Sequence, residues 1–415
     1  MSILVVGGGI GGLTLALSLH QAGIACRVFE AAPEIKPLGV GINLLPHAMR
    51  ELTELGLQER LAAVAVETNE FCYYDRFGRF IYKEPRGRFA GYDWPQLSIH
   101  RGDLHAVMLE AVRERLGPDS FVLGKKCTSF AQDKSGVDKS GVRVDFSDGS
   151  SASGAAVIGC DGIHSAVRKL LHPNEGPPAY QGINMWRGVT RGQPYLSGAS
   201  MVIAGWLEVG KMVVYPIRNF PDGTQLLNWV AEIQSTRNAM QDWNLAGKLE
   251  DFYPVFEGRT HDWLDIAAMI RNAMSILEYP MVDRDPLPFW TQGRVTLLGD
   301  AAHPMHPRGS NGGGQAILDA RVLAGCLRRE ASVESALAAY EKARLEPAYE
   351  VVIANRSQGP DAILRKVHER TGDKPFERIE DVIGNDELAA LAENYKRIAG
   401  FEREALRQRA PLVQQ

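Results

Sequence analysis

A glycine-rich turn near the N-terminus constrains the fold of this chain more than any other feature. Gly7, Gly9 and Gly12 follow the short apolar run Ile3–Val6, and a leucine-rich stretch of helical density comes next. Residues 24–29 then form a second strand-like run. Strand, tight turn, helix and strand within about 30 residues predict a parallel βαβ unit, the usual half of a dinucleotide-binding domain.

Each glycine of the turn has a separate predicted role. Gly7 permits the turn, Gly9 lets the backbone approach a pyrophosphate, and Gly12 lets the helix pack on the strand. The helix N-terminus offers amide donors to the anion, and Glu30 at the end of the second strand is placed to bind ribose hydroxyls. A glycine-rich turn without a ligand is the alternative, and the turn alone does not separate NAD from FAD.

Two later segments resemble buried parallel strands and also end in glycine and aspartate. Residues 155–158 precede Gly159-Cys160-Asp161-Gly162, and residues 295–298 precede Gly299-Asp300. Asp161 is either an acceptor for sugar hydroxyls or a helix cap, and Arg168 reaches a phosphate or pairs with an acidic neighbour.

The composition between these segments shifts toward that of an antiparallel sheet. Residues 178–290 are enriched in Trp, Tyr, Val and Thr, with a turn at 221–223. We therefore predict an α/β protein in which a Rossmann-like cofactor domain, residues 1–177 and 291–415, carries an inserted substrate domain at 178–290. Helices are predicted at 316–328 and 333–355, and the segment after Gly359 is polar and unassigned.

Composition and charge exclude several classes of protein. Apolar residues make up 45% and charged residues 23% of the chain, and the formal net charge is -4, so no basic surplus attracts nucleic acid or a membrane surface. The five cysteines form no CxxC pair, and we expect them to be reduced. No signal peptide or membrane-spanning stretch is evident, which favours a cytoplasmic location.

A third motif makes a resemblance specific. Gly299-Asp300-Ala301-Ala302-His303-Pro304 is followed by Pro307-x-Gly309 and by Gly312-Gly313-Gly314, which open the helix that carries Asp319. With the two earlier motifs, in this order and spacing, the chain resembles the group A flavoprotein monooxygenases, the para-hydroxybenzoate hydroxylase-like aromatic hydroxylases. The resemblance implies a glutathione reductase-type FAD domain with an inserted, mostly antiparallel substrate sheet and C-terminal helices.

The resemblance also implies residue roles around FAD. Asp300 binds the ribityl chain, Arg101 reaches the phosphates or the ribityl chain, and the helix beginning near Gly312 directs amide donors at the flavin pyrimidine edge. Position 314 is a departure, since the family often has Asn there. The full set assigned to FAD is Gly7, Gly9, Ile10, Gly11, Gly12, Glu30, Ala31, Val40, Gly41, Arg101, Cys127, Asp161, Asp300, Pro307, Gly309, Gly312, Gly313 and Gly314.

His303 and His306 invite a metal-site interpretation. They lack a third ligand at suitable spacing, so a structural or flavin-lining role is favoured and no metal is predicted.

Further segments narrow the subgroup. Residues 37–43, 98–104, 185–190 and 279–288 resemble the phenazine-hydroxylating monooxygenases, which implies a fused-ring aromatic carboxylate as substrate. Aromatic strands suggest a substrate wall, with ordinary sheet core as the alternative for each member. Arg187 or Arg284 could meet a carboxylate or form a structural ion pair. The predicted wall consists of Trp186, Arg187, Tyr215, Trp229, Tyr279 and Met281.

The resemblance implies that NADH or NADPH reduces FAD and that molecular oxygen forms the C4a-hydroperoxide which hydroxylates the aromatic ring. Because no second GxGxxG is present, the nicotinamide coenzyme is expected to bind transiently, and no catalytic residue is assigned. Monomer and homodimer both remain open.

The alternatives to this function are a salicylate- or hydroxynicotinate-type single-ring hydroxylase, a flavin oxidase or reductase, and a non-catalytic FAD-binding protein. The Trp-x-Trp-x-Ile-Pro signature of flavin-dependent halogenases is missing.

Overall fold

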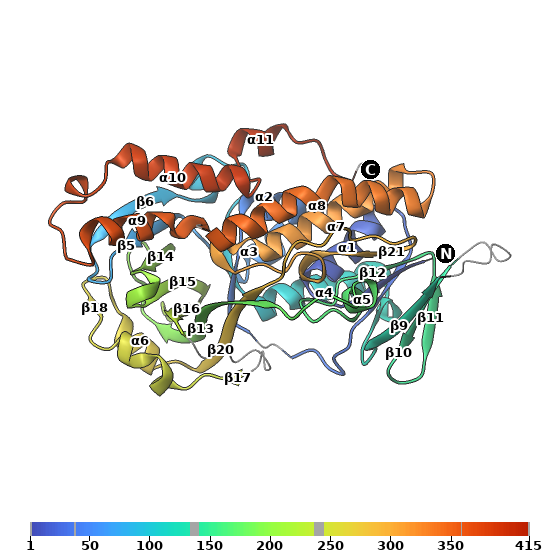
Figure 1. Cartoon of the computed structure of the whole chain (residues 1–415), viewed down its shortest axis with the longest axis horizontal. Helices are drawn as coiled ribbons and strands as arrows, with labels where there is room; N and C mark the ends of the chain where they lie inside the picture. Colours follow the sequence, from blue (N-terminus) through green and yellow to red (C-terminus); the bar gives the residue numbers. More distant parts are fainter. Residues whose placement is uncertain (1, 37–38, 133–140, 236–244, 358, 414–415) are drawn as a thin grey trace.

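The computed structural model describes residues 2–36, 39–132, 141–235, 245–357 and 359–413 and confirms the α/β class. Figure 1 shows an elongated molecule. A small parallel sheet and the long helices α7 and α8 lie towards one end, and a large sheet lies towards the other, beneath the C-terminal helices α9 and α10. In the described residues, no helix combines the length and apolar character needed to cross a membrane.

The first sheet is the predicted parallel one. Its five strands run in the order β21-β12-β1-β2-β8, and every neighbouring pair is parallel. Four of them lie where the sequence predicted strands, because short, mostly apolar runs suit a sheet that is covered on both faces. The strands are β1 (Ile3–Val6), β2 (Cys26–Phe29), β8 (Phe121–Val122), β12 (Ala156–Gly159) and β21 (Val295–Leu297).

Long helices pack around this sheet. Helix α1 contacts α4 and α7, and α8 lies along α7. The predicted helices at 316–328 and 333–355 correspond to α7 and α8, each slightly longer than expected. These helices and the shorter ones on the same part of the chain are α1 (Ile10–Gln21), α2 (Pro46–Glu54), α3 (Gln58–Ala62), α4 (Arg101–Leu116), α5 (Ala166–Leu171), α7 (Gly312–Arg329) and α8 (Val333–Ser357).

Two three-stranded antiparallel sheets complete this part of the molecule. One has the order β11-β10-β9 and the other has the order β3-β7-β4. Their strands are β3 (Gly41–Leu44), β4 (Ala65–Glu67), β7 (Leu97–His100), β9 (Cys127–Gln132), β10 (Val142–Phe146) and β11 (Ser151–Gly154).

The large sheet is mostly antiparallel, as predicted. Its order is β17-β20-β13-β16-β15-β14-β5-β6, and only β14 and β5 pair in parallel. Because β5 and β6 precede residue 178, a substrate domain limited to 178–290 would omit two strands of its own sheet. The strands are β5 (Glu70–Tyr74), β6 (Phe80–Pro85), β13 (Ala179–Gly192), β14 (Ser200–Ala204), β15 (Lys211–Asn219), β16 (Gln225–Gln234), β17 (Leu245–Ala246) and β20 (Ser275–Asp283), with a small hairpin of β18 (Thr260–His261) and β19 (Leu264–Asp265) beside α6 (Ile266–Arg271).

The two faces of the large sheet have different partners. On one face, Trp186 and Trp229 pack with Phe252 in an aromatic cluster. On the other face, part of the sheet packs against apolar side chains of α9 and α10, including Ile363 and Leu388. The polar segment after Gly359 is therefore helical, and its helices α9 (Ala362–Thr371) and α10 (Asn385–Ile398) cover part of this face. Helix α11 (Arg403–Gln408) follows α10 along the chain.

Candidate active site

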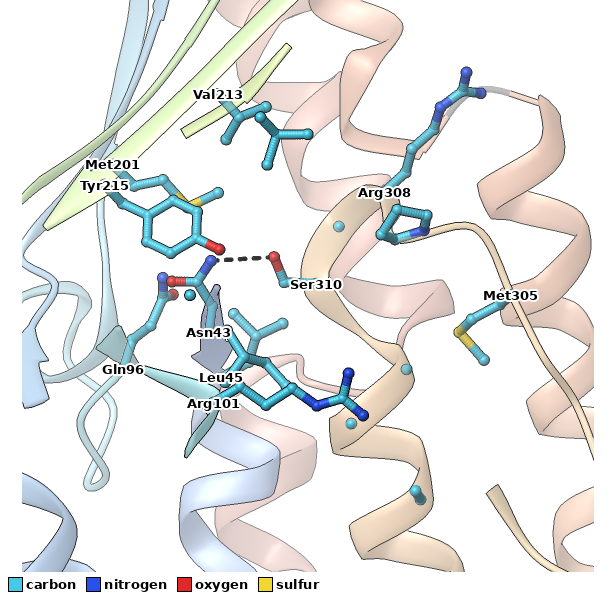
Figure 2. A pocket seen from close by; sticks show the side chains of 18 of the residues that line it. Asn43, Leu45, Gln96, Arg101, Met201, Val213, Tyr215, Met305, Arg308 and Ser310 are labelled. Carbon is cyan, nitrogen blue, oxygen red and sulfur yellow. Dashed lines mark hydrogen bonds between the residues drawn. The ribbon is translucent and has the colours of Figure 1, made fainter. Parts of the chain in front are cut away.

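A cavity of about 340 Å³ lies between the glycine-rich turns and the large sheet. Figure 2 shows that Met201, Val213 and Tyr215 of the sheet form one wall, while Arg308 and Ser310 lie across from them. Ser310 accepts a hydrogen bond of 3.3 Å from the Asn43 side chain. The cavity thus joins the predicted cofactor elements to the predicted substrate sheet.

The three glycines of the first turn are needed for different reasons. Gly7 has φ +107°, and a Cβ there would lie 2.3 Å from the Cys160 carbonyl oxygen. A Cβ on Gly12 would lie 2.0 Å from the Gly7 carbonyl oxygen, so both positions need glycine for the protein's own packing. A Cβ on Gly9 would meet nothing within 4 Å. Glycine at position 9 therefore leaves open space on the cavity wall, as close approach of a ligand requires.

Helix α1 begins at Ile10 with its N-terminal amides available. Gly9 at the N-cap makes no side-chain capping hydrogen bond, and the first turn contains no acidic residue. The first N–H groups of a helix lack intrahelical acceptors and form an anion site. Glu30 accepts hydrogen bonds from the Gly8 and Ala32 amides, each at 2.8 Å, which fixes its carboxylate beside the turn.

The N-terminus of a second helix, α7, also reaches the cavity; this helix follows the Gly299-Asp300 motif. Helix α7 begins at Gly312, and its N-cap Asn311 makes no side-chain capping hydrogen bond. Gly312, Gly313 and Asp300 all line the cavity. Two uncapped helix N-termini on one cavity would stabilise a ligand with negative charge at two separate places.

Asp319 holds the third motif against α7. Its carboxylate accepts from the Gly299 amide at 3.0 Å, lies 2.5 Å from His303 Nε2 and accepts from Arg344 Nε at 2.7 Å. Burial opposes ionisation, but His303 and Arg344 hold the pKa of Asp319 at about 2. His303 therefore has a structural partner. His306 lies 3.5 Å from Asp283, and burial lowers its pKa to about 4.

The cavity brings together ten of the eighteen residues predicted to bind the cofactor. The remaining eight do not line it. The lining residues are Gly9, Ile10, Gly11, Gly41, Arg101, Asp300, Pro307, Gly309, Gly312 and Gly313, and those outside the lining are Gly7, Gly12, Glu30, Ala31, Val40, Cys127, Asp161 and Gly314.

Asp161 caps a helix in this structure. Its carboxylate accepts from Ser165 Oγ at 2.5 Å and from the backbone amides of Ala166 and Val167 at 2.7 and 3.3 Å. Those amides belong to the first turn of α5. Of the two roles that the sequence left open, the geometry supports helix capping, because the side chain is directed at α5 and does not line the cavity.

Arg168 likewise forms an ion pair. Its guanidinium donates to both Glu175 carboxylate oxygens at 2.7 and 2.6 Å and to the carbonyl oxygens of Ala301 and Ala302. These contacts tie α5 to the turn that carries Asp300. The alternative of phosphate binding by Arg168 is therefore not what the structure shows.

His47 explains why position 314 is glycine. A Cβ on Gly314 would lie 2.5 Å from His47 Nε2, so the histidine occupies the space of a side chain there. His47 is fully buried and stacks on Phe401 with ring centroids 5.5 Å apart. Burial, with Arg409 and Arg344 nearby, lowers the pKa of His47 to about 3, so the imidazole is neutral.

The predicted substrate wall is partly corrected. Arg187 and Tyr215 line the cavity, but Trp186 and Trp229 belong to the aromatic cluster on the opposite face of the sheet. Neighbouring residues on a strand point to opposite faces, so Trp186 and Arg187 could not both face the cavity. Tyr279 lies beside Met185, and with Met281 it packs beyond the edge of the cavity.

The two arginines considered as carboxylate partners have different surroundings. Arg187 lines the cavity, donates to the Gly41 carbonyl oxygen at 2.8 Å and lies beside Tyr215. Arg284 donates to the Gly176 carbonyl oxygen at 2.8 Å and lies 3.2 Å from Glu175. Arg284 is therefore a structural ion-pair partner, and Arg187 remains available to a ligand.

Sequence reasoning missed most of the apolar wall. Phe71 and Tyr73 come from β5, Met201 and Ile203 from β14, and Val213 from β15. The odd-numbered residues of each strand share one face, because successive side chains of a strand point to opposite faces. These strands are buried on both faces and do not alternate between apolar and polar residues, so the local pattern does not indicate which face lines the cavity.

Comparison with known proteins identifies the family. A family profile described as an FAD binding domain matches residues 1–249 and 281–355. The chain belongs to this family. Its relatives include a phenazine 1,6-dicarboxylic acid hydroxylase of Lysobacter antibioticus, 43% identical over 366 residues, or 86% of this chain and 89% of the relative. Another is an aurachin C monooxygenase/isomerase of Stigmatella aurantiaca, 35% identical over 85% of this chain and 87% of the relative.

A solved structure agrees with this assignment. A variant of Klebsiella pneumoniae HpxO in complex with FAD matches with a TM-score of 0.72 and 25% identity, over 96% of this chain and 94% of that chain. This member of the FAD binding domain family is therefore an FAD-dependent aromatic monooxygenase that uses NADH or NADPH and oxygen.

The residues present fit FAD. The open wall at Gly9 and the uncapped N-terminus of α1 suit a pyrophosphate, and Asp300 and Arg101 line the continuation of the cavity. The uncapped start of α7 suits the electron-rich edge of a flavin ring. When bound, FAD supplies the electron transfer and oxygen chemistry, and the protein supplies position, charge and exclusion of water.

Proposed function

We propose that this enzyme hydroxylates a planar, fused-ring aromatic carboxylate of the phenazine class. The observation that carries the proposal is the apolar slot on the large sheet, built from Met201, Ile203, Val213 and Phe71, beside the predicted flavin position. A flat apolar wall suits a polycyclic aromatic ring, and the most similar relative described above acts on a phenazine dicarboxylic acid.

Arg187 is the proposed partner of a carboxylate near the flavin. It donates to the Gly41 carbonyl oxygen at 2.8 Å, and its Nε has no hydrogen-bond partner among the described residues. A guanidinium with donors to spare suits a carboxylate. Tyr215 lies beside it, and burial raises the pKa of this phenol although Arg187 opposes the shift.

The remaining roles also stay proposals. We infer that the cofactor residues assigned from sequence hold FAD as that assignment states, except for Asp161, which caps α5. NADH or NADPH is proposed to visit transiently, and a cytoplasmic monomer or homodimer is the expected form.

The test is coupled turnover. Substrate-stimulated oxidation of NADH and NADPH, with product identified by mass spectrometry under labelled oxygen, is measured for phenazine carboxylates, salicylate and hydroxynicotinate. We expect faster coupled hydroxylation of the phenazine carboxylates. Faster coupled turnover of the single-ring acids would reject the fused-ring substrate while leaving the monooxygenase assignment in place.

A further inference from the structure

The cavity face of the large sheet has an apolar centre and charged borders. Paired positions place Arg187 beside Val230, Val230 beside Val213, Val213 beside Ile203, and Ile203 beside Tyr73. In the adjoining row, Met201 pairs with Phe71 and Phe71 pairs with Glu84. An aromatic substrate on this face would therefore lie on apolar side chains with charges at its ends.

The border at β6 is a cluster of one carboxylate and two cations, which we call the β6 charge cluster and define as Glu84, Arg86 and Lys396. Glu84 Oε1 lies 2.6 Å from Arg86 Nη2, and Glu84 Oε2 lies 2.7 Å from Lys396 Nζ. All three residues line the cavity. Lys396 belongs to α10, so the C-terminal helix contributes directly to the cavity wall.

This cluster carries an excess of positive charge. Burial opposes ionisation of Glu84, but Arg86 and Lys396 hold the pKa of its carboxyl below the usual value, so it contributes one negative charge against two positive ones. Glu393 lies 3.2 Å from Lys396, but its side chain is 61% exposed and strongly screened by solvent. The side chains of Arg86 and Lys396 are only 12% and 18% exposed.

A second buried charge cluster on this face is balanced. Lys211 lies 2.8 Å from Glu232 and 2.6 Å from Asp361, and Arg308 lies 3.4 Å from Asp361. That second cluster therefore contains two cations and two carboxylates. Of the two clusters, only the one at β6 has an uncompensated cation within the cavity.

Arg86 is also oriented with donor capacity unused. Its guanidinium carbon lies 4.8 Å from the centroid of the Phe71 ring, which lines the same cavity. Arg86 Nε is buried and has no hydrogen-bond partner in the described part of the chain. A buried N–H without an acceptor costs free energy that an anionic ligand would recover.

The distance across the sheet favours a long ring system. From Tyr215 on β15, near Gly41, the sheet crosses β14 and β5 to reach β6. Three inter-strand steps amount to about 14 Å. A single aromatic ring near the flavin cannot cover this distance, whereas a three-ring system with a peripheral carboxylate and an extended arginine side chain can.

We propose that Arg86 and Lys396, which flank and together exceed the charge of Glu84, bind a carboxylate of the aromatic substrate at the end distant from the flavin. The inference rests on the proposed fused-ring substrate and adds a specificity-determining site to it. Helix α10 then belongs to the substrate site, because it delivers Lys396. The alternative is that the cluster only fastens α10 to β6.

The experiment compares an anionic ligand with a neutral one. Dissociation constants of phenazine-1-carboxylate and its carboxamide are measured from changes in flavin fluorescence of the FAD-loaded enzyme. Arg86→Met should weaken carboxylate binding about 10- to 100-fold and carboxamide binding less than about twofold, as loss of a charge-assisted contact predicts. Lys396→Met should have a smaller effect of the same kind. Arg88→Met, an exposed arginine paired with Glu67, is the matched control.

The variant Glu84→Gln distinguishes a cluster that binds the substrate carboxylate from a cluster that only holds α10 against β6. Removing the carboxylate frees both cations, so carboxylate binding should become tighter while carboxamide binding stays constant. Equal weakening of both ligands in Arg86→Met, or weaker carboxylate binding in Glu84→Gln, would overturn the proposal. Thermal unfolding and flavin content of each variant show whether the fold is retained, and Glu84→Gln remains decisive if Arg86→Met does not fold.

An error in the proposed fused-ring substrate is distinguishable from an error in the proposed anion site. If the wild-type enzyme binds no phenazine, the same comparison is made with salicylate and salicylamide, and an Arg86 dependence confined to salicylate would support the anion site alone. Phenazine turnover without any Arg86 dependence would reject the anion site and leave the proposed function unaffected.

Discussion

The glycine-rich side of the cavity and the sheet side are built by different means. The glycine side is formed by backbone, since Gly9, Gly12 and the starts of α1 and α7 define its shape. The sheet side is formed by side chains such as Val213 that strand pairing brings together. Backbone sites follow from local sequence motifs, whereas a side-chain wall depends on long-range register.

Substitution of two glycines gives the largest expected difference. Gly12→Val should strongly destabilise the fold, because a Cβ there overlaps the Gly7 carbonyl oxygen and overpacking typically costs about 1–3 kcal/mol or more. Gly9→Val should fold but lose FAD, because its side chain enters space that the protein leaves open. Thermal unfolding and the flavin-to-protein absorbance ratio measure both effects. A folded, yellow Gly9→Val protein would contradict the ligand role of this turn.

The two faces of the large sheet should respond oppositely to substitution. Trp229→Ala removes a fully buried ring from the aromatic cluster and should cost about 3–5 kcal/mol, with little change in KM for the aromatic substrate. Val213→Phe narrows the cavity and should raise KM with a smaller loss of stability. Denaturant unfolding and steady-state kinetics distinguish the effects. A large change in KM for Trp229→Ala at unchanged stability would restore its predicted substrate role.

The difference between the backbone-built and the side-chain-built sides of the cavity explains what the sequence could and could not predict. The βαβ turn, four parallel strands and α7 follow from local patterns, and all were predicted. Assigning Trp186 to the cavity failed because a one-residue alternation decides the face, and the face depends on pairing with distant strands. Lys396 could not be found from sequence, since only the packing of α10 places it beside Glu84.

The free energy of unfolding at acid pH should depend on His47, which lies on the glycine-rich side of the cavity. His47 is neutral when folded, with its pKa lowered to about 3, whereas in the unfolded chain it has the ordinary value of 6.5. Its contribution is complete above pH 6.5 and is lost as the pH falls toward 3, with a slope approaching about 1.4 kcal/mol per pH unit. Burial of His306, which lowers its pKa to about 4, acts in the same direction.

Urea unfolding of wild type and His47→Gln between pH 7.5 and 5 tests this linkage. Glutamine does not titrate, so the variant should lose the share of the pH dependence that His47 contributes. His20→Gln, on the exposed side of α1, is the matched control. Equal pH dependence in wild type and His47→Gln would show that His47 does not titrate as described.

The smallest expected effect concerns Asp161, on which the sequence left two roles open. Because its carboxylate caps α5, Asp161→Ala should lower the free energy of unfolding by about 1 kcal/mol, the usual value of an N-cap. The FAD dissociation constant should change less than about twofold, since loss of a direct ribose contact would cost roughly 1–3 kcal/mol in binding. Asp161→Asn, which retains an acceptor oxygen, should recover most of the stability. Denaturant unfolding and flavin fluorescence titration of both variants measure the two quantities separately. Tenfold weaker FAD binding at unchanged stability would instead assign Asp161 to the cofactor and place it with the backbone-built side of the cavity.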